Sequence, residues 1–493
     1  MVFILVQPHM PTPIFRRQIR LPSAGWPVAG VLFAASMGAY GQDAESAPEL
    51  IRAVVVVPRV SVTETFTDNI NLVDVSKRSD QVTEISPGIR ITRKGGGFTG
   101  FFDYALIGVG YAQNSLPSHT QNALNTFGTL EAIEKWAYLD FNGSIAQQSI
   151  SAFGTPSNQN SSINTNRTEV SSYRVSPYLR GNLGNLANYE ARYSQTVVHG
   201  DASSVSGVTT TDGSLFVSGS SALKSLGWSA DVSQQDIAYS AGRPTEAATM
   251  NLGLSYAVTP QLSVLANAGR EASNYTSLDK QNYSTNSVGF SWLPSERTRL
   301  TFSQGHRSFG ENHSLIFEQR TALTLWKFTD SQDVSAAPSQ TLLLLNNTNP
   351  AAPVISSFLS AAVSIQRRQD LSLSLFGVRD TITFVASNSE NRRLDTISTA
   401  VDDLLAAQVH QLGFSIDYLH RLTPEYSLGI FASQQKTWGG LGLQDTNFHY
   451  LNWSLTGKTG KNTSATLGLR RAVYDSVAPY AETALSINLN VQF

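Results

Sequence analysis

The chain has 493 residues, of which 15% are charged, whereas a typical soluble domain has about 25% charged residues. A mean hydropathy of -0.13 argues against a bundle of membrane helices, because each such helix needs roughly twenty apolar residues in a row. The absence of cysteine excludes thiolate nucleophiles and cysteine-based metal sites. What remains is a chain rich in Ser, Thr, Asn, Gln and Gly, which suits strands that are apolar on one face only.

Residues 1–41 are predicted to be a secretory signal peptide. A basic cluster precedes the short apolar run 26–35 and consists of Arg16, Arg17 and Arg20. Small residues at Ala39 and Gly41 suit cleavage after Gly41. Because the segment ahead of the basic cluster is long, Met10 is an alternative start. Cleavage removes three Arg and no acid, so the formal charge changes from -2 to -5, and we expect no nucleic-acid partner.

Residues 42–57 are predicted to form a periplasmic segment ahead of a barrel that covers residues 58–493. The first strand is expected near residues 59–67. Its last residues begin the pattern E-T-x-T-D-N-I-x-L at 64–72, which is followed by S-D-x-V-T-E-I-S-P-G-I at 79–89.

The far end of the chain carries a second set of motifs, namely Arg470-Arg471, Tyr480-Ala481-Glu482 and the terminal Phe493. Together with the opening patterns, these resemble the first and last hairpins of the outer-membrane β-barrel family associated with the PEP-CTERM/exosortase exopolysaccharide systems of Gram-negative bacteria. The resemblance covers the chain from about Val60 to the end. It implies a role in exopolysaccharide export or surface assembly, with exopolysaccharide and periplasmic export components as partners.

Short turns are expected at four places between alternating strands: Gly184-Asn185, 258–262, 293–297 and 422–426. Long polar connections are expected at 113–121, 149–167, 200–212, 241–247, 271–282, 438–445 and 475–481. Short turns on one side and long loops on the other are typical of an outer-membrane barrel, whose short turns face the periplasm. We therefore expect an all-β, antiparallel transmembrane barrel of about 18–20 strands, with an even number of strands.

Strand parity assigns candidate lumen-facing residues in two regions. In the strand 136–146, the inward residues are Trp136, Tyr138, Asp140 and Asn142, which together could stack on and hydrogen-bond to sugar rings. The alternative is that Trp136 and Tyr138 belong to an aromatic girdle at the membrane interface. If Leu300 and Phe302 face lipid, then Arg297 and Arg299 face inward. These two Arg could hold an anionic sugar or a plug carboxylate, or form a structural ladder with facing acids.

Two segments interrupt the strand pattern. Within residues 330–370, the stretch 353–365 starts with Pro and has apolar residues at helical spacing, so a small helical insertion is expected there. Parity between single strands near 315–329 and 371–386 places this insertion in the periplasm. The stretch 399–411 also has helical spacing. Either segment could plug the lumen or be only a helical connection; the candidate plug residues are Phe358, Leu359, Arg367 and Arg368.

The last strand alternates without a fault. Its apolar face consists of Leu485, Ile487, Leu489, Val491 and Phe493, and its polar face includes Asn488 and Asn490. An alternating strand that closes on Phe resembles the assembly signal of bacterial outer-membrane barrels, which implies the barrel-assembly machinery and outer-membrane lipid as partners. The alternative is an ordinary terminal strand of a soluble all-β protein.

An enzyme would need a constellation of residues that is not found. The eight His are scattered without H-x-x-x-H or H-E-x-x-H spacing, and there is no G-x-S-x-G. Lys94-Gly95-Gly96-Gly97 lacks the spacing of a phosphate-binding loop and predicts a turn. We expect no catalytic site, no metal and no cofactor.

The function favoured by these patterns is a polar-lined conduit in the Gram-negative outer membrane. Two alternatives remain open. One is a general diffusion porin for small solutes. The other is a structural or adhesive barrel that binds surface glycans or proteins through its long outer loops.

Overall fold

The computed structural model describes residues 54–493 except 114, 157–158, 160–161, 163, 203–204, 221–224, 336–362, 395–407 and 440–444. The described residues form one sheet of 22 strands. The strands are β1 (Val54–Thr67), β2 (Asp80–Arg93), β3 (Phe98–Tyr111), β4 (His119–Ile133), β5 (Ala137–Ser149), β6 (Arg167–Leu183), β7 (Ala187–Gly200), β8 (Val208–Ser220), β9 (Leu226–Tyr239), β10 (Thr245–Ala257), β11 (Leu262–Ser273), β12 (Gln281–Ser295), β13 (Thr298–Arg307), β14 (Gly310–Arg320), β15 (Thr324–Ser335), β16 (Ser364–Phe376), β17 (Asp380–Arg393), β18 (Gln408–Arg421), β19 (Tyr426–Gly439), β20 (Thr446–Gly460), β21 (Thr463–Asp475) and β22 (Tyr480–Gln492).

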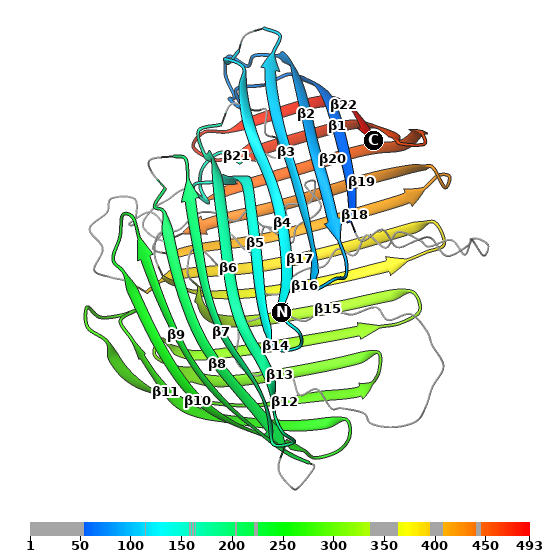
Figure 1. Ribbon diagram of the computed structural model, residues 1–493. Helices are drawn as coiled ribbons and strands as arrows, with labels where there is room; N and C mark the ends of the chain where they lie inside the picture. Colours follow the sequence, from blue (N-terminus) through cyan, green and yellow to red (C-terminus); the bar gives the residue numbers. More distant parts are fainter. Residues whose placement is uncertain are drawn as a thin grey trace, which may run out of the picture.

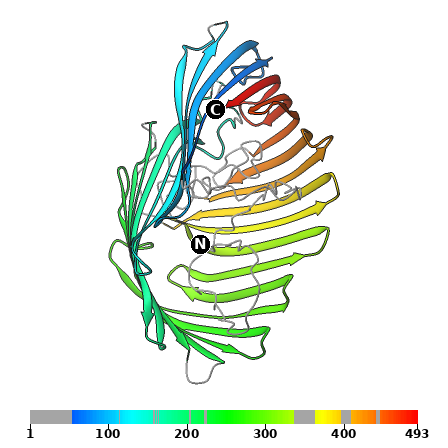
Figure 2. The same ribbon diagram turned by 45° about the vertical axis from the view of Figure 1, so that its right-hand side comes forward.

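The sheet closes on itself. Every strand pairs antiparallel with the next, and β1 pairs with β22 in a register that runs from Arg59 opposite Gln492 to Thr67 opposite Ala484. In Figures 1 and 2 the first strands therefore lie beside the last ones. Closure leaves no free edge along this seam, which confirms the predicted antiparallel barrel.

The two faces of each strand follow the alternation in the sequence. In β10, Met250, Leu252 and Leu254 are 55%, 57% and 57% exposed, while Asn251 and Ser255 on the other face are less exposed. Apolar side chains on the outside of a barrel contact lipid, and polar ones line the lumen. The described residues include no helix that is long and apolar enough to cross a membrane.

The connections separate into two ends of the barrel. The predicted turns at 184–186, 258–261, 296–297 and 422–425 all lie at the end where β1 begins and β22 finishes. We call this the turn end. Gly184 adopts the positive φ of 60° that its turn requires. The predicted long connections lie at the opposite end, which we call the mouth.

The strand number is 22, not the expected 18–20. Two tight turns divide stretches that were expected to be single strands: 321–323, between β14 and β15, and 377–379, between β16 and β17. The first of these, Thr321-Ala322-Leu323, has no Gly, Pro, Asn or Asp to indicate a turn. Its geometry comes from the Thr321 hydroxyl, which accepts from the Thr324 amide at 2.9 Å.

The two missed turns also reverse the expected side of the insertion, because each strand expected beside it is a hairpin. β15 ends and β16 begins at the mouth, so the connection between them starts from the mouth and not from the expected periplasmic side. The insertion was expected to cover 330–370, but residues 330–335 belong to β15 and residues 364–370 belong to β16.

The expected boundaries of the barrel and of the second helical segment also differ from those in the structure. β1 begins at Val54, four residues before the expected start of the barrel. Residues 408–411 belong to β18, although helical spacing was expected to 411. The predicted signal peptide, the plug candidates Phe358 and Leu359, and most of both predicted helices lie outside the described residues.

Candidate functional site

The middle of the inner wall is lined mainly by neutral polar side chains. Strand register and alternation place these residues inward: Thr63, Asn142, Thr249, Asn267, Ser303, Ser372, Ser415, Ser433, Asn452 and Asn488. Several of them bond to one another across strands, as Asn267 does to Ser287 at 3.0 Å. The wall therefore offers many weak hydrogen-bonding groups and no continuous charged stripe.

Some inward charges lie opposite acids or bases of the neighbouring strands. Arg299 of β13 lies opposite Glu318 of β14, whose carboxylate is 3.5 Å from the Lys327 amine of β15. The register places Arg299 on the same face as Glu318, and the structural-ladder alternative for Arg299 stays a prediction. Arg297 lies exposed in the β12–β13 turn, outside the lumen wall.

The plug candidates Arg367 and Arg368 are wall residues. Both lie in β16, and Arg368 Nε donates to Asp370 at 2.6 Å. Arg367 lies on the opposite face of the strand, with its guanidinium 3.7 Å from Asp330. A role in a plug is wrong for these two residues, because side chains held within the wall cannot occupy the lumen centre.

The region around Tyr138 is already filled. The Tyr138 and Tyr178 rings stack with centroids 5.0 Å apart, and the Arg180 guanidinium lies 4.1 Å from the Tyr138 centroid. Both faces of Tyr138 are thus occupied, so this ring cannot stack on a sugar. Asp140 accepts from Thr129 at 2.7 Å and from Arg192 at 2.9 Å.

Trp136 lies apart from that stack, in the β4–β5 turn rather than in the expected strand. It is 43% exposed, and its indole N–H donates to the Tyr189 hydroxyl at 2.8 Å. Asn142 remains on the inner wall, opposite Arg174 in the strand register. The four residues expected to form one sugar site therefore do not form a single open surface.

The terminal strand is held to the first strand by its polar face. Asn488 donates to the Ser61 hydroxyl at 2.8 Å and to the Thr63 hydroxyl at 2.7 Å, and Asn490 lies opposite Ser61. Its other face points outward, with Leu485, Ile487 and Leu489 39%, 49% and 45% exposed. Val491 and Phe493 continue this face to the turn end, where the Phe493 amide donates to the Pro58 carbonyl at 2.9 Å. An assembly-signal role for this face stays a prediction.

At the mouth, the motifs from the two ends of the chain meet. Arg470 donates to Glu482 at 2.8 Å, and the Thr67 hydroxyl donates to the same carboxylate oxygen at 2.8 Å. The side chains of Arg470 and Glu482 are each 5% exposed. Asn69 joins them, because its amide donates to the Ala481 carbonyl at 3.0 Å. The opening and closing motifs thus form one buried network that fastens β22 to β1.

The inner face of the mouth carries apolar clusters beside its buried polar networks, which the expected polar lumen did not anticipate. Four buried clusters lie near the mouth ends of the strands. Their buried members are Leu72, Phe431, Phe448, Tyr450, Ala472, Tyr474 and Tyr480; Val170, Val198, Val208 and Ile237; Ile70, Val82, Val109 and Tyr111; and Ala247, Tyr275 and Val363. Apolar side chains facing an open aqueous lumen would be unfavourable. In three of the clusters, loop residues supply part of the cover, namely Leu72, Ile70 and Tyr275.

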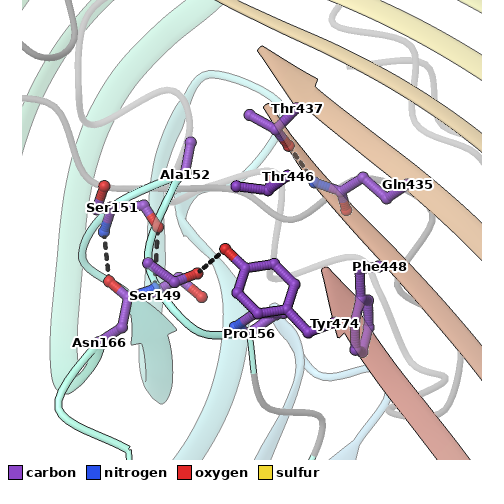
Figure 3. A pocket seen from close by; sticks show the side chains of 11 residues that line it. Ser149, Ser151, Ala152, Pro156, Asn166, Gln435, Thr437, Thr446, Phe448 and Tyr474 are labelled. Atoms are coloured by element: carbon purple, nitrogen blue, oxygen red, sulfur yellow. Dashed lines mark hydrogen bonds between the residues drawn. The ribbon is translucent and has the colours of Figure 1, made fainter. Parts of the chain in front are cut away.

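The β5–β6 loop is one such cover (Figure 3). The Tyr474 hydroxyl donates to the Phe153 carbonyl at 2.9 Å, and the Tyr480 hydroxyl donates to the Pro156 carbonyl at 2.7 Å. A small pocket lies between this loop and the wall; it is lined by Ser149, Ser151, Ala152, Gly154, Pro156, Asn166, Gln435, Thr437, Thr446, Phe448 and Tyr474. Four strands, β1 to β4, separate β5 from β22 in the sheet. The loop therefore leaves its own wall to reach another one.

A second ionic network lies at the mouth on the far side of the barrel. Arg307 Nε donates to the fully buried Glu271 at 3.0 Å, and its Nη1 donates to Asp333 at 2.9 Å. Tyr275, in the adjacent β11–β12 loop, is buried beside it, and burial raises the pKa of its phenol. Within the described part of the chain, no group of three or more His, Asp or Glu could hold a metal ion.

The comparisons with known proteins concern the fold. No protein-family model matches the chain, and no curated protein matches it. Among solved structures, it is similar to the FrpB iron transporter from Neisseria meningitidis. The F5-1 variant apoprotein has a TM-score of 0.53 and 10% identity, with 88% of this chain and 81% of that chain covered. The F3-3 variant has a TM-score of 0.51 and 12% identity, with the same coverage. At this low identity the likeness shows the fold alone, a closed β-barrel.

Proposed function

We propose that the protein is a transport barrel of the Gram-negative outer membrane that passes hydrated, uncharged saccharide, in association with exopolysaccharide export or surface assembly. The observation that carries the proposal is the inner wall, where neutral Ser, Thr and Asn predominate and Arg299 lies opposite Glu318 in the wall. Neutral hydroxyl and amide groups can exchange hydrogen bonds with passing sugar hydroxyls without holding them tightly.

The width of the barrel supports passage of a polymer. If the cross-section is circular, 22 strands that are about 4.8 Å apart and tilted by about 45° enclose about 45 Å between opposing backbones. Side chains of the wall cannot fill such a space. Barrels of 22 strands in outer-membrane transporters enclose a plugged lumen, so residues 336–362 and 395–407 are the segments of this chain to test as a plug.

The exopolysaccharide role rests on the resemblance of the two terminal motifs. The two motifs meet in the network of Arg470, Glu482 and Thr67, where their hydrogen bonds hold β22 to β1. The cargo, the periplasmic export partners and cleavage after Gly41 belong to the same proposal. The likeness to an iron transporter concerns the barrel and supports transport in general.

A diffusion porin for small solutes is the second candidate. The observation in its favour is the β5–β6 loop, which crosses from β5 to the wall of β19–β22 and so narrows the mouth. A narrow mouth would admit small solutes and retain polymers.

Swelling of proteoliposomes in sugar solutions tests both candidates. We would compare the intact protein with a variant that has residues 336–362 replaced by a short Gly/Ser linker, using glucose, maltohexaose and a neutral dextran. Entry of dextran, at least after removal of the segment, supports the polymer conduit. Entry of glucose alone in both forms favours the porin. If neither form admits any sugar, a transport role is wrong.

A further inference from the structure

The β5–β6 loop makes contacts that a passive surface loop would not need. We define the strap as residues 150–156, which directly follow β5. Its carbonyls at Phe153, Gly154 and Pro156 accept hydrogen bonds from tyrosine hydroxyls of β21 and β22. More than 300 residues separate the partners along the chain, so no local turn preference produces these bonds.

The strap also packs closely against β19, at a position where the wall has a Gly. At Gly439 of β19, an added Cβ would come within 2.8 Å of the tip of the Phe153 ring. The ring therefore lies directly on the backbone of β19, where a side chain would displace it. In Figure 3, Ser151, Ala152 and Pro156 of the strap line the small pocket together with Thr437, Thr446 and Tyr474 of the wall.

The base of the strap is fastened by one side chain. The Asn166 amide donates to the Ser151 carbonyl at 3.0 Å, and its oxygen accepts from the Ser151 backbone N–H at 2.8 Å. Gly154 has no room for a Cβ, because an added atom would meet the Asn166 side chain. These bonds keep the strap directed across the mouth.

The docked strap covers an aromatic surface. Phe448, Tyr474 and Tyr480 are 7%, 2% and 3% exposed. If the strap were released, these rings and the polar Gln435 and Thr446 beside them would face the lumen. Docking therefore buries apolar area at the same time as it narrows the opening.

We propose that the strap determines the size of solute that passes the mouth, and that Tyr474 and Tyr480 are the residues that set this limit by holding the strap closed. This inference rests on the proposed transport function and adds the element that governs its selectivity. When the strap is docked, only small solutes pass between it and the opposite wall; when it is released, larger ones pass.

The test removes the two hydroxyls and keeps the rings. Each lost hydrogen bond should shift the ratio of docked to released strap by roughly fivefold, so Tyr474→Phe with Tyr480→Phe should shift it by roughly 30-fold. We expect larger single-channel conductance in planar bilayers and entry of larger oligosaccharides into proteoliposomes. The matched control is Tyr104→Phe with Tyr418→Phe, which removes hydroxyl donors to Asn122 and Asp380 away from the strap.

A covalent lock provides the reverse experiment. The chain has no cysteine, so Ala152→Cys with Thr446→Cys introduces a single pair on opposite sides of the pocket. A short, reducible bis-thiol cross-linker should restore the small conductance of the intact protein in the Tyr474→Phe, Tyr480→Phe background, and reduction should release it again.

The outcomes separate this inference from the proposed function. If every form, locked or released, conducts with one size limit, the strap does not govern passage and transport itself stands. If no form conducts ions or sugars, the transport function is wrong and the strap inference falls with it. Failure of the cysteine pair to cross-link in the folded barrel would also overturn the docked arrangement.

Discussion

Both ends of the barrel have ion pairs between an Arg and a carboxylate, but the pairs differ in how far they are exposed to water. At the mouth, Arg470 and Glu482 form an ion pair in which each side chain is 5% exposed. At the turn end, Arg90 pairs with Asp103, but the Arg90 side chain is 56% exposed. Water screens the second pair and not the first. Burial, more than the identity of the charges, therefore decides what each pair contributes.

Connection length explains why the ends differ. A turn such as 296–297 is too short to fold back over the wall, so inward side chains at that end stay near water. The β1–β2 connection at 68–79 is long enough for Ile70 and Leu72 to reach the inner wall, where they are 1% and 5% exposed. Covered charges and covered apolar residues accordingly gather at the mouth.

The largest effect is expected from breaking the buried pair at the mouth. Arg470→Ala leaves Glu482 buried with only the Thr67 hydroxyl beside it, which should destabilise the barrel by about 3–5 kcal/mol. The measurement is the urea midpoint for loss of the heat-modifiable folded form in detergent. The double variant Arg470→Ala with Glu482→Ala should be less destabilised than the single one; equal midpoints would contradict the buried-charge explanation.

Substitutions in the middle of the barrel should show which face of a strand contacts lipid and which lines the lumen. Leu252→Arg places a charge on the lipid face and should cost about 2–4 kcal/mol, measured by the folding equilibrium in lipid vesicles. Ser229, on the inner face opposite Gly253, provides the matched position. Ser229→Arg should fold normally and shift ion selectivity toward anions. A reversed pattern would mean that the assigned faces are wrong.

A smaller, local effect is expected at the base of the strap. Asn166→Ala removes both bonds to Ser151 and should weaken the local structure by about 1–2 kcal/mol. Faster amide hydrogen exchange confined to 150–156 would show this. Asn185→Ala, in the turn between β6 and β7, is the control. Unchanged exchange in the strap would indicate that the wall contacts alone hold it.

The smallest effect is expected at the turn end. Arg90→Ala should change the free energy of unfolding by less than about 1 kcal/mol, because Arg90 is largely exposed and Asp103 keeps Arg59 as a partner at 2.5 Å. The urea midpoint of this variant should match that of the intact protein at high salt. A loss as large as that of Arg470→Ala would remove the distinction between the two ends.

The sequence by itself determined the features that depend on local alternation. Side chains of a strand alternate between two faces, so periodicity alone assigns Leu485, Ile487 and Leu489 to one face and neutral residues such as Asn488 to the other. The turns at Gly184-Asn185 and at Pro260, Pro294 and Pro424 were equally predictable, whereas the turn that begins at Gly377 was missed. The turn at 321–323 was not predictable, because its stability comes from a hydroxyl bond that Thr makes in many settings. This turn and the one at 377–379 together raised the strand count to 22 and reversed the side of the insertion.

Only the tertiary structure decided how the mouth is closed. The contact of Tyr474 with Phe153 depends on the path of a loop across the opening, and no periodicity in the sequence encodes that path. The apolar clusters at the mouth also escaped prediction, since Ile70 and Leu72 join them from a loop that was expected to be only a connection between two strands. Local patterns determine which way a side chain points, and the closed barrel determines what it meets there.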